Sequence, residues 1–151
     1  METLGAALER EHREIDDGIT AFLSEPSRTE SLTQAMSGLR RHIYLEEEFL
    51  FPPLREAGMM APVFVMLREH GEMWSTMAAL DAELADPSAT GTVKDSCREL
   101  VGQLERHNEK EEQILYPQAD SALTPAAANR LREFLASGQL PDGWICTKAR
   151  S

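Results

Sequence analysis

The sequence is poor in aromatic residues, cysteine and positive charge, and each shortage excludes a class of protein. Aromatic residues make up 6% of the 151 residues, and no stretch alternates polar and apolar residues for long, which argues against a β-sheet protein. The two cysteines, Cys97 and Cys146, are too few for the disulfide framework of a small secreted domain. Fifteen Lys and Arg face 26 Asp and Glu, giving a net charge of -11. We expect no nucleic-acid partner, because phosphate binding needs a basic surface.

Long apolar runs are also missing. The longest, from Met59 to Leu67, is interrupted by Pro62, so we expect no membrane-spanning segment and no membrane partner. The first residues are charged and polar and do not resemble a signal segment. With 42% apolar and 27% charged residues, the chain fits one ordinary domain, which we expect to be cytoplasmic.

Apolar residues recur at helical spacing in four long segments that end at or near prolines. The second segment runs into Pro52 and Pro53, which should kink or end it, and the third opens at Pro62. We predict an all-α protein, an up-down-up-down four-helix bundle with a short C-terminal helix that begins at Thr124 and Pro125. Residues 1–120 should form the bundle, and residues 121–151 a short helix and an irregular tail that packs on it or trails from it.

An internal repeat divides the chain into two related hairpins. Residues 42–52 (HIYLEEEFLFP) align with residues 107–117 (HNEKEEQILYP), and both read His, three residues, two Glu, one residue, two apolar residues, an aromatic and Pro. The sequence Arg-Glu-His also occurs twice, ending at His12 and at His70. Each predicted hairpin therefore carries a single histidine on its first helix and a His-x3-Glu motif on its second.

The histidines and two glutamates continue the apolar stripes of their helices. His107 and Glu111, for example, follow Leu100 and Leu104 at helical spacing. An unpaired ionised carboxylate in a bundle core would cost several kcal/mol or be forced to protonate. A divalent metal removes this difficulty, since neutral imidazole and carboxylate are its ligands. The candidate metal ligands are His12, His42, Glu46, His70, His107 and Glu111.

The two histidines of each predicted hairpin lie equally far from the turn between its helices. The separation is about 12 residues in the first hairpin and about 15 in the second, or ~18 to 22 Å at ~1.5 Å per residue, so all the ligands meet at one level. Two His-x3-Glu pairs and two single histidines suit two metals, and this ligation in a bundle favours iron or manganese over structural zinc. Cys97 lies roughly 15 Å along the helix from His107 and is excluded as a ligand.

The six candidate ligands, together with the aromatic-Pro ending of each repeat, resemble the hemerythrin-like (HHE cation-binding) family over roughly residues 4–120. The resemblance implies a four-helix bundle around two non-haem irons, which bind dioxygen or nitric oxide. It also implies that each iron is held by two histidines, and that the glutamates bridge the irons with an oxo or hydroxo group. By this resemblance, His12 and His42 would hold one iron, and His70 and His107 the other. Glu46 and Glu111 would bridge the two irons.

One departure from the family pattern selects among its functions. Oxygen carriers have a second histidine four residues after the one on the third helix, and here that place holds Trp74. The four-His, two-Glu set is closer to members that repair iron centres or respond to nitric oxide, of which the repair proteins usually add a cysteine-bearing N-terminal region. We therefore expect dioxygen or nitric oxide binding in gas or redox response, or in iron handling that includes repair.

Two alternatives stay open. The first is a di-iron enzyme that reduces nitric oxide, peroxide or dioxygen with electrons from an external donor such as a redox partner protein, because no Gly-x-Gly-x-x-Gly fingerprint is present. The second is a bundle that is merely stabilised by its metals.

Lesser roles are predicted for the residues beside the ligands. Three glutamates are expected to face solvent: Glu47, Glu48 and Glu112. For two tyrosines, Tyr44 and Tyr116, ordinary packing is expected in preference to a hydrogen bond near the site. For Glu11 and Glu69, a hydrogen bond to a ligating histidine and simple surface exposure are equally consistent with the sequence.

The predicted metal site can be tested by substituting one ligand. In the variant His107→Ala we expect metal content and thermal stability to fall together, because the free energy of metal binding is part of the free energy of folding. Metal analysis and thermal unfolding of the same preparation measure both. A variant with unchanged melting would contradict the site.

Overall fold

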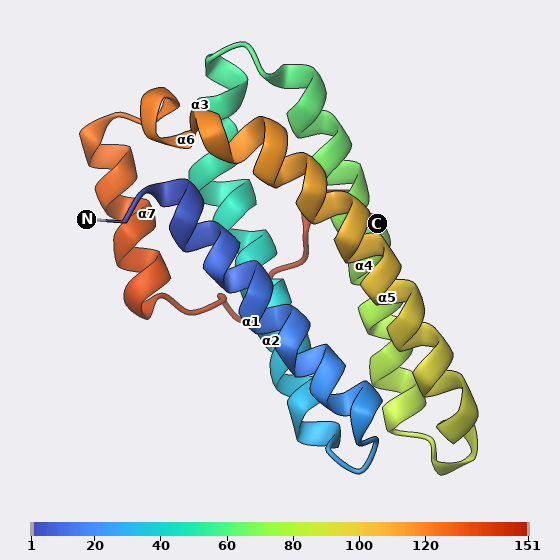
Figure 1. Cartoon of the computed structure of the whole chain (residues 1–151). Helices are drawn as coiled ribbons and strands as arrows, with labels where there is room; N and C mark the ends of the chain where they lie inside the picture. The colour runs from blue at the N-terminus through green and yellow to red at the C-terminus, as the bar shows by residue number, and fades with distance from the viewer. Residues whose placement is uncertain (1, 151) are drawn as a thin grey trace.

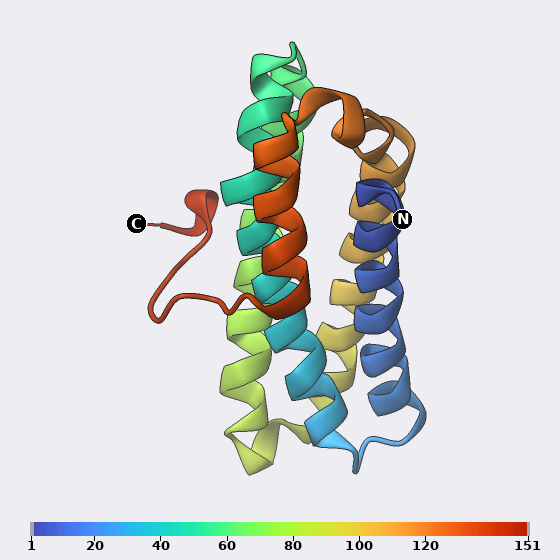
Figure 2. The same ribbon diagram turned by 90° about the vertical axis from the view of Figure 1, so that its left-hand side faces the viewer.

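The computed structural model describes residues 2–150, and this part of the chain contains helices and no strand. The predicted all-α class is confirmed. Helix α1 (Leu4–Ser24) packs along α2 (Thr29–Leu45), and α4 (Met60–Leu84) packs along α5 (Thr90–Lys110) (Figure 1). The two helical hairpins lie side by side in one elongated bundle (Figure 2).

Each hairpin continues beyond its second long helix through a π-helical turn. Helix α2 runs into η1 (Glu46–Leu50) and then α3 (Phe51–Glu56). Helix α5 runs in the same way into η3 (Glu111–Leu115) and then α6 (Tyr116–Ala122). The two repeats of the sequence are thus two copies of one local structure.

The prolines of the second segment do not end the helical path. Pro52 and Pro53 lie inside α3, directly after the π-helical turn η1. The chain turns at Gly58, whose φ of +96° is in the left-handed region that favours glycine. Helix α4 then begins at Met60, slightly earlier than the predicted start at Pro62.

Side-chain caps fix the starts of two helices. The Thr3 hydroxyl accepts a hydrogen bond from the Ala6 N–H at the start of α1. The Thr124 hydroxyl does the same for the Ala127 N–H at the start of α7 (Pro125–Ser137). The predicted start of the C-terminal helix is therefore confirmed. Two short 3-10 turns complete the fold, η2 (Pro87–Ala89) and η4 (Thr147–Ala149).

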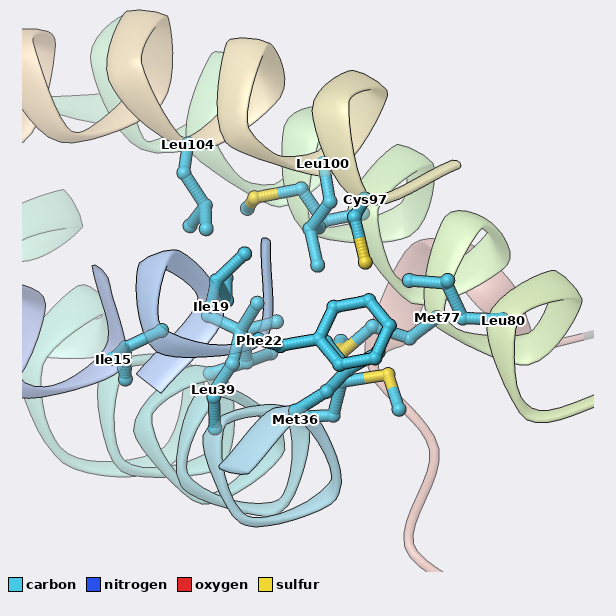
Figure 3. Close-up of a cluster of buried hydrophobic side chains, with 14 of the residues drawn as sticks. Ile15, Ile19, Phe22, Met36, Leu39, Met77, Leu80, Cys97, Leu100 and Leu104 are labelled. Carbon is cyan, nitrogen blue, oxygen red and sulfur yellow. The ribbon is translucent and has the colours of Figure 1, made fainter. Parts of the chain in front are cut away.

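The buried apolar side chains form two clusters. The first apolar cluster lies toward the two hairpin loops (Figure 3) and includes Ile15, Ile19, Phe22, Met36, Leu39, Met77, Leu80, Cys97, Leu100 and Leu104. The second apolar cluster lies toward α3 and α6 and includes Leu4, Leu8, Leu45, Leu50, Phe51, Leu54, Leu115, Tyr116 and Leu131. Along α1 and α4, His12 and His70 fall between residues of the second cluster and residues of the first. His42 lies near the end of α2, between Leu39 of the first cluster and Leu45 of the second, and His107 lies between Leu104 of the first cluster and Leu115 of the second. A layer of polar side chains therefore separates the two apolar clusters.

The C-terminal part of the described chain packs on the bundle. The Arg41 guanidinium donates hydrogen bonds to the backbone carbonyls of Phe134, Leu135 and Gly138, at the end of α7. Beyond α7, the Trp144 ring packs edge-on against Tyr44, and η4 lies against α4 (Figure 2). None of the helices in the described range is both long enough and apolar enough to cross a bilayer.

A close contact between α1 and α2 makes the fold testable at two glycines. A Cβ on Gly18 would lie 2.9 Å from the Cβ of Ala35, whereas one on Gly38 would meet Ile15 at an ordinary 3.7 Å. We expect Gly18→Ala to lower the free energy of unfolding, because overpacking costs about 1–3 kcal/mol and the gain in helix propensity is at most about 1 kcal/mol.

The variant Gly38→Ala is the matched control, since it makes the same chemical change in the same helix pair without the clash. It should keep or raise the unfolding free energy, through its helix propensity alone. Urea unfolding of both variants measures the difference. Equal effects would show that the two helices do not approach as described.

Candidate metal centre

The six predicted ligands lie together in the polar layer between the two apolar clusters. All are buried, with at most 3% of each residue exposed. They form two groups, in each of which one nitrogen or oxygen atom per residue lies within 4.8 Å of the others: His12, His42, Glu46 and Glu111, and Glu46, His70, His107 and Glu111. We name these the first and the second ligand group. Both glutamates belong to both groups.

A wide turn of the backbone places each glutamate. Glu46 begins the π-helical turn η1 and Glu111 begins η3, and their carbonyls accept from the N–H groups of Phe51 and Tyr116, five residues on. A proline follows each of these aromatic residues. In a continuous α-helix its ring would clash with the carbonyl four residues earlier, and the wider turn relieves that clash. The same turn brings the aromatic ring to the face of the helix that carries the glutamate.

The four imidazoles point their Nε2 atoms toward these two carboxylates. Each glutamate lies between the histidine of its own helix and a histidine of the other hairpin. The distances from Nε2 to a carboxylate oxygen are 3.4 Å for His42 and 3.0 Å for His70 with Glu46, and 3.1 Å for His12 and 3.3 Å for His107 with Glu111. The Nε2 atoms therefore converge on the centre.

The outer nitrogen of every imidazole also faces a carboxylate. The four Nδ1 contacts are His42 with Glu11 (2.9 Å), His107 with Glu69 (3.0 Å), His70 with Glu47 (2.8 Å) and His12 with Glu112 (2.7 Å). Such a contact fixes the ring orientation and leaves Nε2 available to a metal. Of the two readings that the sequence left open for Glu11 and Glu69, the structure supports hydrogen bonding.

The expectation that Glu47 faces solvent was wrong, because Glu47 is buried. Glu112 faces solvent in part, with 38% of its side chain exposed, and its carboxylate also reaches His12. An α-helical projection turns both residues away from the core, but the π-helical turn that begins one residue earlier redirects them. The sequence does contain a signal for these contacts, because glutamate occupies the same position in both repeats. Glu48, by contrast, is exposed as predicted.

Tyr116 is a further residue of the site, and the expectation of packing in preference to a hydrogen bond was wrong. Its hydroxyl donates to Glu46 Oε2 at 2.6 Å and lies 3.1 Å from Glu111 Oε1. It also lies 2.9 Å and 3.0 Å from the Nε2 atoms of His12 and His42. Burial and the two carboxylates hold the pKa of Tyr116 well above its usual value, so the phenol stays protonated beside them.

A comparison with family models decides what this arrangement is. The Hemerythrin HHE cation binding domain matches residues 3–119. The chain belongs to this family. The match covers both hairpins and all six predicted ligands, so the resemblance seen in the sequence is confirmed at the level of the family. Neither the curated proteins nor the solved structures contain a match to the chain.

In this hemerythrin domain, further polar groups hold the outer glutamates. Arg41 donates to Glu11 at 2.9 Å, and Lys110 pairs with Glu69. The Thr147 N–H and hydroxyl both donate to Glu47, at 3.0 and 2.8 Å. Burial raises the pKa of Glu69, but its hydrogen bonds with His107 and Lys110 outweigh burial and lower the pKa to about 2. Glu69 is therefore ionised, and the contacts with Arg41, Lys110 and Thr147 hold three of the outer glutamates in place.

The same contacts raise the pKa values of His42, His70 and His107. Burial lowers the pKa of His42, but Glu46 and Glu11 outweigh it and bring the pKa to about 10. Burial also lowers the pKa of His107, and the charge of Glu111 does most to bring that pKa to about 10. Without a bound cation, the hemerythrin domain balances its buried carboxylates with imidazole protons, which a metal has to displace.

The residues present fit a bound cation. Glu111 Oε2 is buried and has no hydrogen-bond partner among residues 2–150, a loss of about 1–3 kcal/mol that a cation shared by the two ligand groups would offset. The donors are imidazole nitrogen and carboxylate oxygen, which suit iron or manganese. Burial raises the pKa of the Cys97 and Cys146 thiols to about 11, and both residues belong to the first apolar cluster.

The pKa shifts predict how the stability of the metal-free protein depends on pH. The pKa values of His42 and His107 rise from 6.5 to about 10, so their stabilising contribution is complete below pH 6.5 and is lost as the pH rises through 10. The contribution of Glu69, whose pKa falls from 4.5 to about 2, is complete above pH 4.5 and is lost on acidification through 2. In a chelator, melting temperature should therefore peak between pH 4.5 and 6.5 and fall toward pH 8.

With saturating Mn²⁺ the stabilisation over the chelated sample should instead grow from pH 6 to pH 8, since fewer protons compete for the imidazoles. Parallel melting curves with and without chelator measure this difference. Two curves that run parallel across that range would contradict the assignment of the histidines as ligands.

Proposed function

We propose that this hemerythrin domain is a non-haem di-iron protein that binds dioxygen or nitric oxide, in gas or redox response or in iron handling that includes the repair of iron centres. The observation that carries the proposal is the pair of ligand groups that share Glu46 and Glu111. Each iron would be held by two imidazoles and by the shared carboxylates. Sparse nitrogen and oxygen ligation of this kind leaves open positions on non-haem iron.

The chain's own residues would prepare the centre for a small ligand. When bound, the irons supply redox chemistry and the positions at which a diatomic gas binds. The two apolar clusters exclude water from both ends of the polar layer. The outer glutamates hold the imidazoles in one orientation, and before a cation binds, the Tyr116 hydroxyl donates a hydrogen bond to Glu46.

The place of Trp74 supports a centre with four histidines rather than the five of oxygen carriers. Its ring packs edge-on against Trp144, at 5.5 Å between ring centroids, and Arg40 lies 5.7 Å above it. Trp74 therefore contacts the C-terminal segment at the place where a carrier would have a further imidazole. This favours the nitric-oxide-responsive and repair members of the family over reversible oxygen carriage.

The proposal extends to architecture and location. We infer an up-down-up-down order for α1, α2, α4 and α5, a metal-binding unit in residues 1–120, and a covering segment in residues 121–151. The contact of Arg41 with the end of α7 supports a cover that is packed on the unit. We also infer a cytoplasmic location, because both cysteines are free thiols, as is usual for proteins of the cytoplasm.

A second candidate function is the reduction of nitric oxide, peroxide or dioxygen with electrons from a redox partner. The buried hydroxyl of Tyr116 favours it, because a group that carries a proton lies within 3.1 Å of both shared carboxylates. Reduction of any of these ligands consumes protons as well as electrons.

Iron analysis with a matched pair of variants tests the proposal. Wild-type protein from iron-replete cells should hold about two irons per chain and absorb light through oxo-to-iron charge transfer. Adding nitric oxide anaerobically to the reduced protein should change its spectrum. Glu46→Gln should lose most of the iron, whereas Glu48→Gln, the same change at an exposed neighbour, should keep it.

The possible outcomes separate the candidate functions. Binding of nitric oxide or dioxygen without turnover supports the first, and steady-state consumption in the presence of a reductant selects the second. An iron-loaded protein that responds to neither nitric oxide nor azide has metals with a structural role only. Stoichiometric zinc without iron in metal-replete cells would contradict both candidate functions.

A further inference from the structure

We propose that Tyr116 makes the two cation positions unequal by adding an oxygen donor to the first ligand group alone. This inference rests on the proposed function, since it requires two cations in the centre. It concerns a residue outside the six predicted ligands. It follows from where one hydroxyl lies within an otherwise repeated structure.

The contacts of the Tyr116 hydroxyl cover the first ligand group completely. It lies 2.9 and 3.0 Å from the Nε2 atoms of His12 and His42, and 2.6 and 3.1 Å from oxygens of Glu46 and Glu111. Within residues 2–150, its hydrogen bonds reach neither histidine that is specific to the second group. The phenol oxygen therefore faces the space enclosed by the first group.

The second ligand group has a carbon ring in the corresponding place. Phe51 follows η1 as Tyr116 follows η3, and the two residues align in the sequence repeat. The Phe51 ring stacks on His70, at 5.4 Å between centroids and 21° between planes. The Tyr116 ring lies on His12 in nearly the same way, at 5.3 Å and 30°. The two aromatic residues thus occupy equivalent places and differ by one hydroxyl group.

Packing fixes the phenol in this position. Tyr116 is 2% exposed and belongs to the second apolar cluster. Its backbone carbonyl lies so close to α1 that a Cβ on Gly5 would approach it to 3.2 Å. The hydroxyl can therefore serve as a preplaced donor, with little side-chain freedom left to lose on binding.

The consequence is a difference in cation affinity between the two positions. Imidazoles and shared carboxylates serve both positions alike, and only the first has a phenol oxygen. On binding a cation this oxygen releases its proton to solvent, and iron accepts the resulting phenolate as a donor in other proteins. The first cation should therefore enter between His12 and His42. The hydrogen bonds of the phenol also fix the shared carboxylates on that side.

Partial loading with a redox-stable cation tests this inference. Crystals of the full-length protein would be grown with one equivalent of Mn²⁺, and anomalous scattering would give the occupancy of each position. In wild-type protein we expect the position at His12 and His42 to be the more occupied. In Tyr116→Phe the two occupancies should become equal, and in titrations the tighter site should weaken by about 10- to 100-fold, the range for loss of a group that supports a metal.

The matched variant Phe51→Tyr adds the missing hydroxyl to the second ligand group. Together with Tyr116→Phe it should reverse the order of filling. Circular dichroism and uptake of two equivalents of Mn²⁺ at saturation show that each variant has kept its fold and its ligands.

Failure of the inference looks different from failure of the proposed function. Equal filling in the wild type, or an unchanged preference in Tyr116→Phe, would overturn the role of Tyr116 while two cations still bind. A wild-type protein that takes up neither Mn²⁺ nor iron would overturn the proposed function and this inference with it.

Discussion

The burial of two carboxylates side by side is the constraint on which the rest of the structure depends. Glu46 and Glu111 are fully buried between two layers of apolar side chains, where their charge must be balanced within a few ångströms. Four imidazoles lie against them, and a second set of glutamates orients the imidazoles. Arg41, Lys110 and Thr147 then bind three of those glutamates closer to the surface.

Helical phase was sufficient to predict the fold class and the gathering of the six ligands, because a polar side chain at a core position of an amphipathic helix must point inward. It could not predict the outer contacts of Glu47 and Glu112, since their directions depend on a π-helical turn. That turn arises where Pro52 and Pro117 conflict with α-helical geometry, and periodicity carries no information about it. Tyr116 was missed for a related reason: its ring faces the centre only because the turn is widened.

The two halves of the centre are alike, but their surroundings are not. The C-terminal segment reaches the first repeat, through the bonds of Arg41 to the end of α7 and of Thr147 to Glu47. In the second repeat, Glu69 is held by Lys110 from the neighbouring helix, and Glu112 is partly open to solvent. The C-terminal segment therefore covers the polar layer at the first repeat, whereas at the second repeat the second hairpin's own helices hold the outer glutamate Glu69.

Neither hairpin holds a complete ligand group on its own. The first supplies His12, His42 and Glu46 and lacks a second carboxylate, which comes from Glu111 across the bundle. The second hairpin supplies His70, His107 and Glu111, and its second carboxylate comes from Glu46 of the first hairpin. Two identical copies of a single hairpin, associated about a twofold axis, would contain the same six donors. The repeat in this chain therefore supplies two matching halves, each of which completes the ligand group of the other.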